Sequence, residues 1–194
     1  MAGTVCNNAS SYISEMTKLL ATLDPAPMDA FADCVYQAWR DGRRVFVFGN
    51  GGSASTASHY VADFVKTAAV AGQKRLAAFC MNDNIGLLTA LGNDISYEET
   101  FSYPLASYAH PGDVAVALSC SGNSPNVLHA VRWAREHGLT VVALTGFEGG
   151  KLKDLADIHI NIPSANYGLI EDLHLSVNHI VAQSLYSRVL AESV

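Results

Sequence analysis

Several features that mark specialised classes of protein are missing from this chain. Only 15% of its 194 residues are charged, the formal net charge is −6, and there is no long run of lysine or arginine. Nucleic acid and anionic membrane surfaces are therefore not expected as partners. No apolar run is long enough to span a membrane, and the N-terminus lacks the basic and apolar regions of a secretion signal, so we expect a cytoplasmic protein.

Common metal and phosphate motifs are missing as well. The four cysteines are widely spaced without a Cys-x-x-Cys pair, which argues against a thiol-rich zinc site and favours reduced thiols. Neither a Walker loop, which needs Gly-Lys-Ser/Thr, nor a G-x-G-x-x-G motif is found. By contrast, 49% of the residues are hydrophobic, which predicts a deeply buried sheet and a helical surface covered by another subunit.

Alternation of apolar strands and helical segments predicts an α/β protein. Apolar residues at helical spacing predict two leading helices, over 8–23 and 28–40, separated by Pro25 and Pro27. Five strands rich in valine, leucine and phenylalanine follow, which is typical of a parallel sheet buried on both faces. Their expected ranges are 44–48, 76–80, 114–119, 140–145 and 158–162. The helices between and after them are expected over 54–66, 84–91, 97–108, 124–137, 151–156 and 167–192.

Two loops at the ends of predicted strands favour phosphate binding. The first, Gly49-Asn50-Gly51-Gly52-Ser53, joins a strand to a helix, a geometry that presents backbone N–H groups to an anion. The second, Ser119-Cys120-Ser121-Gly122-Asn123-Ser124, brings three hydroxyls to a helix start at the same sheet edge. A single serine there would more often be an N-cap, but the two loops together favour a phosphate site.

These two loops are similar to those of the SIS (sugar isomerase) domain family. Further features resemble its phosphoheptose isomerase branch, and they cover nearly the whole chain: His59, Gly92-Asn93-Asp94, Leu144-Thr145-Gly146, Gly149-Gly150-Lys151, His174 and His179. The resemblance implies a three-layer α/β/α, flavodoxin-like fold with a five-stranded parallel sheet, two N-terminal helices and a long C-terminal helix. It also implies a single domain over 1–194, with 1–41 as a helical pair for oligomerisation in a homotetramer and 42–194 as the α/β core.

The resemblance further implies a zinc-assisted ketose–aldose isomerisation. The substrate would be sedoheptulose 7-phosphate, and the product D-glycero-D-manno-heptose 7-phosphate or a close heptose phosphate, a lipopolysaccharide precursor in the family. The phosphate would be held by Asn50, Gly51, Gly52, Ser53, Ser119, Ser121 and Ser124. Asp94 resembles a ligand of sugar hydroxyls, although an aspartate that caps a turn is an equally good interpretation.

The acid–base and metal residues come from two predicted helices. His59 and Asp63 are four residues apart and share a helix face, while Glu171 and His179 are eight apart and point within roughly 80° of each other. On its own, a pair such as His59–Asp63 is more often an ion pair or a core pair. The resemblance implies that these four residues together bind zinc and move protons, and our hypothesis is that His179 is the acid. His174 is expected to be a supporting or core residue.

Two of these positions depart from the family pattern. Asp63 stands where the family has glutamate, and Glu171 stands where it has glutamine. Matching this chain to the family pattern position by position assigns the role of base to Asp63. Because the Asp63 side chain is one methylene shorter than glutamate, Glu171 is a rival candidate for the base. Two other functions stay open: a non-catalytic SIS regulator, such as a replication-initiator-binding protein, and an isomerase of another phosphosugar, such as a hexulose or arabinose phosphate.

Overall fold

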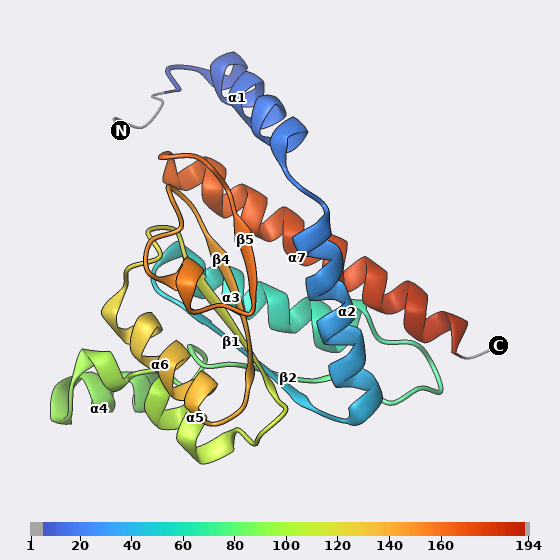
Figure 1. Ribbon diagram of the computed structural model, residues 1–194, viewed down its shortest axis with the longest axis vertical. Coiled ribbons are helices and arrows are strands. Elements are labelled where there is room, and N and C mark those ends of the chain that lie inside the picture. Colours follow the sequence, from blue (N-terminus) through green and yellow to red (C-terminus); the bar gives the residue numbers. More distant parts are fainter. Residues whose placement is uncertain (1–5, 193–194) are drawn as a thin grey trace.

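Five parallel strands form the central sheet of the computed structural model, which describes residues 6–192. The strands are β1 (Arg44–Gly49), β2 (Ala77–Cys80), β3 (Val114–Ser119), β4 (Thr140–Thr145) and β5 (Ile158–Asn161), in the spatial order β2-β1-β3-β4-β5 (Figure 1). The chain moves outward from β1 to β2 and then returns to place β3 on the other side of β1. Ligands bind at such a switch point, outside the carboxyl ends of the strands.

Both faces of the sheet are covered by helices, so the predicted three-layer architecture is confirmed. Val45 and Val47 of β1 point to the layer of α2 (Ala26–Asp41), α3 (Gly52–Ala62) and α7 (Tyr167–Ala191). Phe46 and Phe48 point to the opposite layer, which contains α5 (Ser102–Tyr108) and α6 (Pro125–Glu136). All four side chains are 0% exposed. Burying each of them contributes about 1.5–3 kcal/mol, which is why this strand has no polar alternation.

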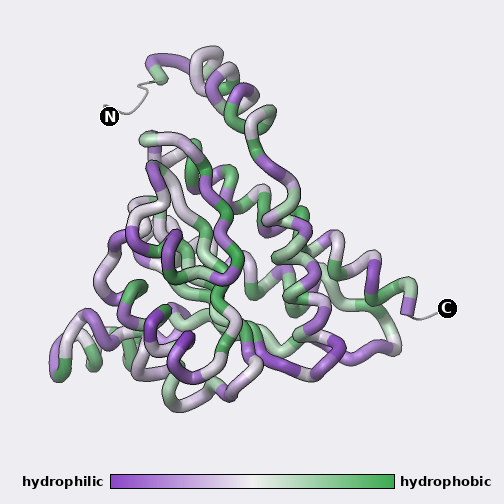
Figure 2. The backbone as a smooth tube through the Cα atoms, in the orientation of Figure 1, coloured by the Kyte–Doolittle hydropathy of each residue, from purple (hydrophilic) through white to green (hydrophobic). Residues whose placement is uncertain are grey.

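Helix α1 (Ala9–Thr22) extends beyond these layers and packs near the start of α7 (Figure 1). A capping box between Asn8 and Ser11 starts it, but none of its residues is buried. Ile13 is 64% exposed and Leu20 is 51% exposed. Figure 2 shows that this helix stands outside the main body and carries both hydrophilic and hydrophobic segments. Its polar attachment is a 2.6 Å hydrogen bond that the hydroxyl of Tyr12 donates to Oδ2 of Asp172.

Several predicted element boundaries are wrong, for identifiable reasons. The helix expected over 97–108 is split into a 3-10 turn at Tyr97–Glu99 and α5, because Pro104 lacks the N–H that a continuous helix needs. The helix expected over 151–156 is only a 3-10 turn, Leu152–Asp154, which follows two glycines with positive φ. Helix α4 continues to Asp94 (Ile85–Asp94), and α3 ends in a π-helical turn, Asp63–Thr67.

Helix α7 is the longest helix of the described residues and runs across one face of the sheet. It begins after Asn166, whose side chain accepts hydrogen bonds from the backbone N–H groups of Gly168 and Leu169. Among the described residues, no helix is long and apolar enough to cross a membrane.

Candidate active site

A small cavity lies at the carboxyl ends of β1 and β3, and serine side chains dominate it. Its volume is about 180 Å³, and it is lined by Asn50, Ser53, Leu118, Ser119, Cys120, Ser121, Ser124, Tyr167 and Glu171. The structure therefore brings the predicted glycine loop and the predicted serine loop to one cavity. It also places Glu171, from the far end of the chain, in the same cavity. None of the described residues that line it is a lysine or an arginine.

The hydroxyl groups in this cavity are available to a ligand. Ser119 Oγ and Ser124 Oγ lie 3.2 Å apart, and Ser53 Oγ lies 4.0 Å from the Sγ atom of Cys120. These are weak neutral pairs that an anion can replace with charge-assisted hydrogen bonds. Ser124 is also the N-cap of α6, and its side chain makes no cap hydrogen bond, so its hydroxyl is not needed by that helix.

Two close approaches of the backbone shape the cavity. Gly52 is the first residue of α3, and a Cβ there would lie 2.5 Å from Oε2 of Glu171. Gly122 has a φ of +64°, and a Cβ there would lie 2.7 Å from the carbonyl carbon of Gly149. Gly122 thus needs glycine, because its φ is positive and its neighbour is backbone, and this contact packs the serine loop on the loop after β4. At Gly52 the missing Cβ lets the Glu171 carboxylate reach the helix start.

Side-chain amides support the glycine loop, and the sequence does not predict these contacts. The side chain of Asn50 exchanges hydrogen bonds with Asn126, which is fully buried, and accepts one from the hydroxyl of Tyr97. Asn82 pairs its side-chain amide with both backbone groups of Gly49, so it acts as a short extension of the sheet. Neither Asn82 nor Asn126 belongs to a recognisable motif; their partners become visible only in the fold.

A second polar cluster lies further along α3 and α7. Asp63 Oδ2 lies 3.3 Å from Nε2 of His59 and 3.6 Å from Nε2 of His179, and the two Nε2 atoms are 3.3 Å apart. The histidine side chains are about half exposed, at 47% and 48%, whereas that of Asp63 is 13% exposed. The cluster therefore presents two imidazoles to solvent over a recessed carboxylate. Among the described residues, these three form the group that could hold a metal ion.

Two further side chains hold Asp63 in this position. Asn178 donates a 2.6 Å hydrogen bond from Nδ2 to Oδ2, and Thr67 donates a 2.8 Å hydrogen bond from Oγ1 to Oδ1. Asp63 and Thr67 are the first and last residues of the π-helical turn, a feature that often marks functional sites. The turn brings Thr67 back toward Asp63.

Glu171 does not join this cluster. Its carboxylate lies beside Gly52, which precedes His59 by seven residues on α3. Glu171 itself precedes His179 by eight residues on α7. Those spacings correspond to about 10–12 Å along the helix axes. The structure thus brings together three of the four residues expected to bind metal and places the fourth in the serine-lined cavity.

Comparison with known proteins identifies the family. The SIS domain model matches residues 11–146. The chain belongs to the SIS domain family. A probable phosphoheptose isomerase from Thermoplasma acidophilum is 36% identical to it over 178 residues, which are 90% of this chain and 95% of the relative. Phosphoheptose isomerase GmhA from Neisseria gonorrhoeae has the same fold, with a TM-score of 0.85, 29% identity, and coverage of 92% and 96% of the two chains.

Another relative carries a different name. The lincomycin biosynthesis protein LmbN of Streptomyces lincolnensis is 41% identical over 179 residues, which are 87% of this chain. The match spans 65% of the length of LmbN, so that protein has a substantial part without a counterpart in this alignment. This chain is therefore homologous to phosphoheptose isomerases and also to a lincomycin biosynthesis protein.

His174 is a core residue of this SIS domain. It is 1% exposed, and its Nε2–H donates to the backbone carbonyl of Thr145, while its own carbonyl accepts a 2.7 Å hydrogen bond from the hydroxyl of Tyr60. Burial lowers the pKa of His174 to about 4, and the bond to Thr145 only partly opposes that shift. A neutral buried imidazole of this kind joins α7 to the end of β4 and does not face the serine-lined cavity.

Asp94 lies apart from the cavity in this chain. It is exposed at the end of α4, and its Oδ1 accepts a 2.7 Å hydrogen bond from the neighbouring Asn93 side chain. It does not line the serine-lined cavity. A role for Asp94 in binding a sugar hydroxyl stays a prediction.

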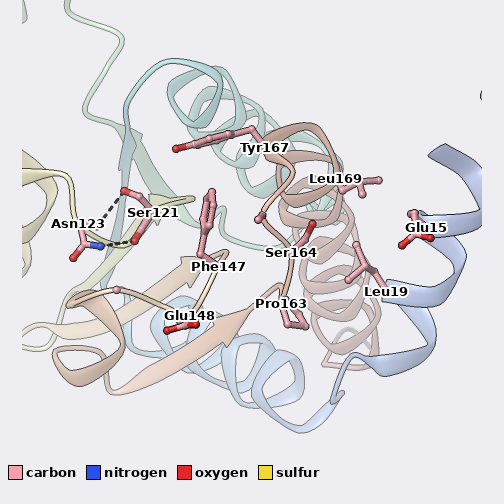
Figure 3. A pocket seen from close by; sticks show the side chains of 12 residues that line it. Glu15, Leu19, Ser121, Asn123, Phe147, Glu148, Pro163, Ser164, Tyr167 and Leu169 are labelled. Carbon is pink, nitrogen blue, oxygen red and sulfur yellow. Dashed lines mark hydrogen bonds between the residues drawn. The ribbon is translucent and has the colours of Figure 1, made fainter. Parts of the chain in front are cut away.

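A larger cavity of about 810 Å³ opens beside the serine-lined one and shares Ser121 and Tyr167 with it. Figure 3 shows Phe147 between the serine loop and Ser164, with Glu15 and Leu19 of α1 on the far wall. The Phe147 and Tyr167 rings meet edge to face at 5.3 Å. Phe147 has a φ of +49°, a strained value for a non-glycine residue, so the loop after β4 holds this ring at a fixed place in the wall.

Proposed function

We propose that this SIS-domain protein is a phosphoheptose isomerase, which converts sedoheptulose 7-phosphate to D-glycero-D-manno-heptose 7-phosphate or a close heptose phosphate. The supporting observation is that a hydroxyl-lined cavity and a His–Asp–His cluster lie two helical turns apart on the same pair of helices. That spacing is about 10–12 Å. It suits an open-chain sugar whose phosphorus and carbonyl carbon lie roughly 9 Å apart when C–C bonds are near 1.5 Å.

The phosphate group is assigned to the serine-lined cavity. Ser53, Ser119, Ser121 and Ser124 would donate hydrogen bonds to it, and the turn Asn50-Gly51-Gly52 would direct the start of α3 toward it. Because no cationic side chain lines the cavity, hydroxyls and helix N–H groups would provide the recognition. Such binding is directional, so it fixes the orientation of the sugar chain relative to the histidines.

The His59–Asp63–His179 cluster fits a zinc ion. Tetrahedral zinc with ligand bonds of 2.0–2.1 Å separates its ligand atoms by about 3.4 Å. The three Nε2 and Oδ2 atoms are 3.3, 3.3 and 3.6 Å apart, and a fourth position remains for substrate. Zinc would serve as a Lewis acid for the carbonyl oxygen of the sugar. Glu171, which we predicted as a fourth ligand, would have to turn away from Gly52 to reach such an ion.

Proton transfer is assigned to the same cluster. Asp63 would remove the proton from the carbon next to the carbonyl, giving a cis-enediolate, and His179 would return a proton to the neighbouring carbon from the ring nitrogen that does not hold the metal. The hydroxyl proton of the first carbon would pass to the oxygen of the second, so that an aldehyde and a new hydroxyl form. Glu171 remains the rival base, but Asp63 is the carboxylate that lies within 3.6 Å of the histidines. His59 would help to hold the carboxylate in place. Asp63→Asn and Glu171→Gln separate the two assignments through their isomerase rates.

We also propose a cytoplasmic homotetramer with a single SIS domain over 1–194, in which the leading helices over 1–41 pack between subunits. The support is that Ile13 and Leu20 of α1, and Tyr186 and Leu190 of α7, are all more than 40% exposed. The free cysteines agree with a reducing compartment. Light scattering at micromolar concentration tests the assembly, and a monomer would contradict it.

The direct test of function is an assay with sedoheptulose 7-phosphate, with and without a chelator. We expect conversion that falls on chelation and returns with zinc. A panel of hexulose and arabinose phosphates distinguishes a different phosphosugar isomerase. Tight sugar-phosphate binding without turnover of any substrate would instead support the regulatory alternative.

A further inference from the structure

The carboxylate of Glu171 lies at the start of α3, where an anion is expected to bind. A Cβ on Gly52 would collide with both carboxylate oxygens, so they lie directly over the first residue of that helix. The N-cap residue is Gly51, which has no side chain to cap the first N–H groups. Glu171 therefore occupies the positive end of an 11-residue helix from within the serine-lined cavity.

The charge of Glu171 has no cationic partner in this cavity. None of the described lining residues is a lysine or arginine, and the volume is only about 180 Å³. The thiol of Cys120 lies in the same cavity, and its pKa is raised to about 11. Burial is the larger cause of this shift, and the Glu171 carboxylate is the next. A phosphate dianion in this cavity would therefore meet both hydroxyl donors and a carboxylate that repels it.

We propose that Glu171 is a specificity-determining residue that selects sugar phosphates over inorganic phosphate. The proposal rests on the assignment of this cavity to the substrate phosphate. A carboxylate accepts hydrogen bonds and donates none, so it repels a bare phosphate dianion. A sugar phosphate carries hydroxyls next to the phosphate, and these donate charge-assisted hydrogen bonds to Glu171 that offset the repulsion. Hydrogen phosphate offers a single P–OH donor, so it offsets less of the repulsion than a sugar chain with several hydroxyls does.

The test is to measure the dissociation constants of inorganic phosphate and of sedoheptulose 7-phosphate at pH 8 for wild type and Glu171→Gln. Glutamine keeps the shape of the side chain and removes the charge. We expect inorganic phosphate to bind Glu171→Gln about tenfold more tightly than wild type, because a like charge at short range is gone. The affinity for the sugar phosphate should stay unchanged or fall, so the selectivity ratio should drop at least tenfold.

Glu148→Gln is the matched control. It makes the same charge change in the neighbouring cavity, and Glu148 does not line the serine-lined one. Phosphate affinity should stay within twofold of wild type in this control. An equal gain in Glu148→Gln and Glu171→Gln would mean that net charge alone matters, which overturns the proposal. Phosphate affinity in Glu171→Gln within twofold of wild type also overturns it.

Ser124→Ala separates this proposal from the assignment of the cavity. If Ser124→Ala leaves the binding of both ligands unchanged in the wild-type and Glu171→Gln backgrounds, the phosphate binds elsewhere and both proposals fail. If Ser124→Ala weakens binding while Glu171→Gln changes no selectivity, the cavity assignment stands and only the role of Glu171 is wrong. Circular dichroism of each variant checks that it is folded.

Discussion

The side-chain amide of Asn178 donates a 2.6 Å hydrogen bond to Oδ2 of Asp63, from α7 to the π-helical turn that follows α3. Asn178 is fully buried, and its Oδ1 is the one buried side-chain atom of the described residues without a hydrogen-bond partner. Burying an amide oxygen without a partner costs free energy of folding. We infer that this cost is accepted because the amide N–H holds the Asp63 carboxylate toward His59 and His179.

Replacing Asn178 tests this positioning. Asn178→Leu keeps a similar volume and removes the donor, so Asp63 should lose its fixed orientation. We expect zinc affinity to fall about tenfold or more, as is usual when a partner of a metal ligand is removed. Competition with a zinc indicator measures this, and thermal unfolding shows whether the fold is intact. Unchanged zinc affinity in a folded Asn178→Leu protein would show that the amide does not position Asp63.

Ser124→Ala tests the phosphate contact. Hydrogen bonds to charged groups contribute about 1.5–3 kcal/mol, so we expect the KM for a sugar phosphate to rise roughly tenfold or more. The free energy of unfolding should change little, because Ser124 makes no cap hydrogen bond to α6. Steady-state kinetics and denaturant unfolding measure the two effects. A KM equal to that of wild type contradicts the contact.

Gly122→Ala tests the packing of the serine loop on the loop after β4. A Cβ there meets the backbone of Gly149, which cannot rotate away, and the residue has a φ of +64°. The matched control is Gly72→Ala, with a φ of +81° and nothing within 4 Å of its Cβ. Both should lose about 1–2 kcal/mol from the left-handed conformation, and Gly122→Ala should lose roughly 1–3 kcal/mol more from the collision. Equal losses would mean that the loops separate easily.

The lowered pKa of His174 makes the free energy of unfolding depend on pH. Its folded pKa is lowered to about 4, so the folded state keeps it neutral, while the unfolded chain binds a proton near pH 6.5. Its contribution to stability is present above pH 6.5 and is lost as the pH falls toward 4, with a slope of about 1.4 kcal/mol per pH unit. Denaturant unfolding at several pH values should show a shallower decline for His174→Gln. Parallel curves for the two proteins would contradict this assignment.

The sequence was sufficient for the architecture and for one half of the site. Strong apolar runs and glycine turns predicted the five strands and the two loops, and the structure brings the serines of those loops to one cavity. The two short helical segments near Tyr97 and Leu152 were predicted as longer helices, because Pro104 and two positive-φ glycines act through local backbone geometry that periodicity does not report.

The supporting residues could not be predicted from the sequence. Asn178 meets Asp63 from 115 positions away, and Asn126 meets Asn50 from 76 positions away, so no local pattern connects them. The sequence also could not predict that the Glu171 side chain lies apart from the two histidines. Helical spacing limited its direction to within roughly 80° of His179, but only the contact with Gly52 shows toward which cluster the side chain turns.

The most direct measurement is the conversion of sedoheptulose 7-phosphate by the purified protein, followed by NMR with zinc present, alongside Asp63→Asn. An isomerase should form the aldose phosphate and, in deuterium oxide, incorporate deuterium at the former carbonyl carbon, which receives a proton; Asp63→Asn should lose at least a hundredfold in rate. A folded wild-type protein that binds the sugar phosphate, holds zinc and yet forms no aldose phosphate would contradict the proposed function.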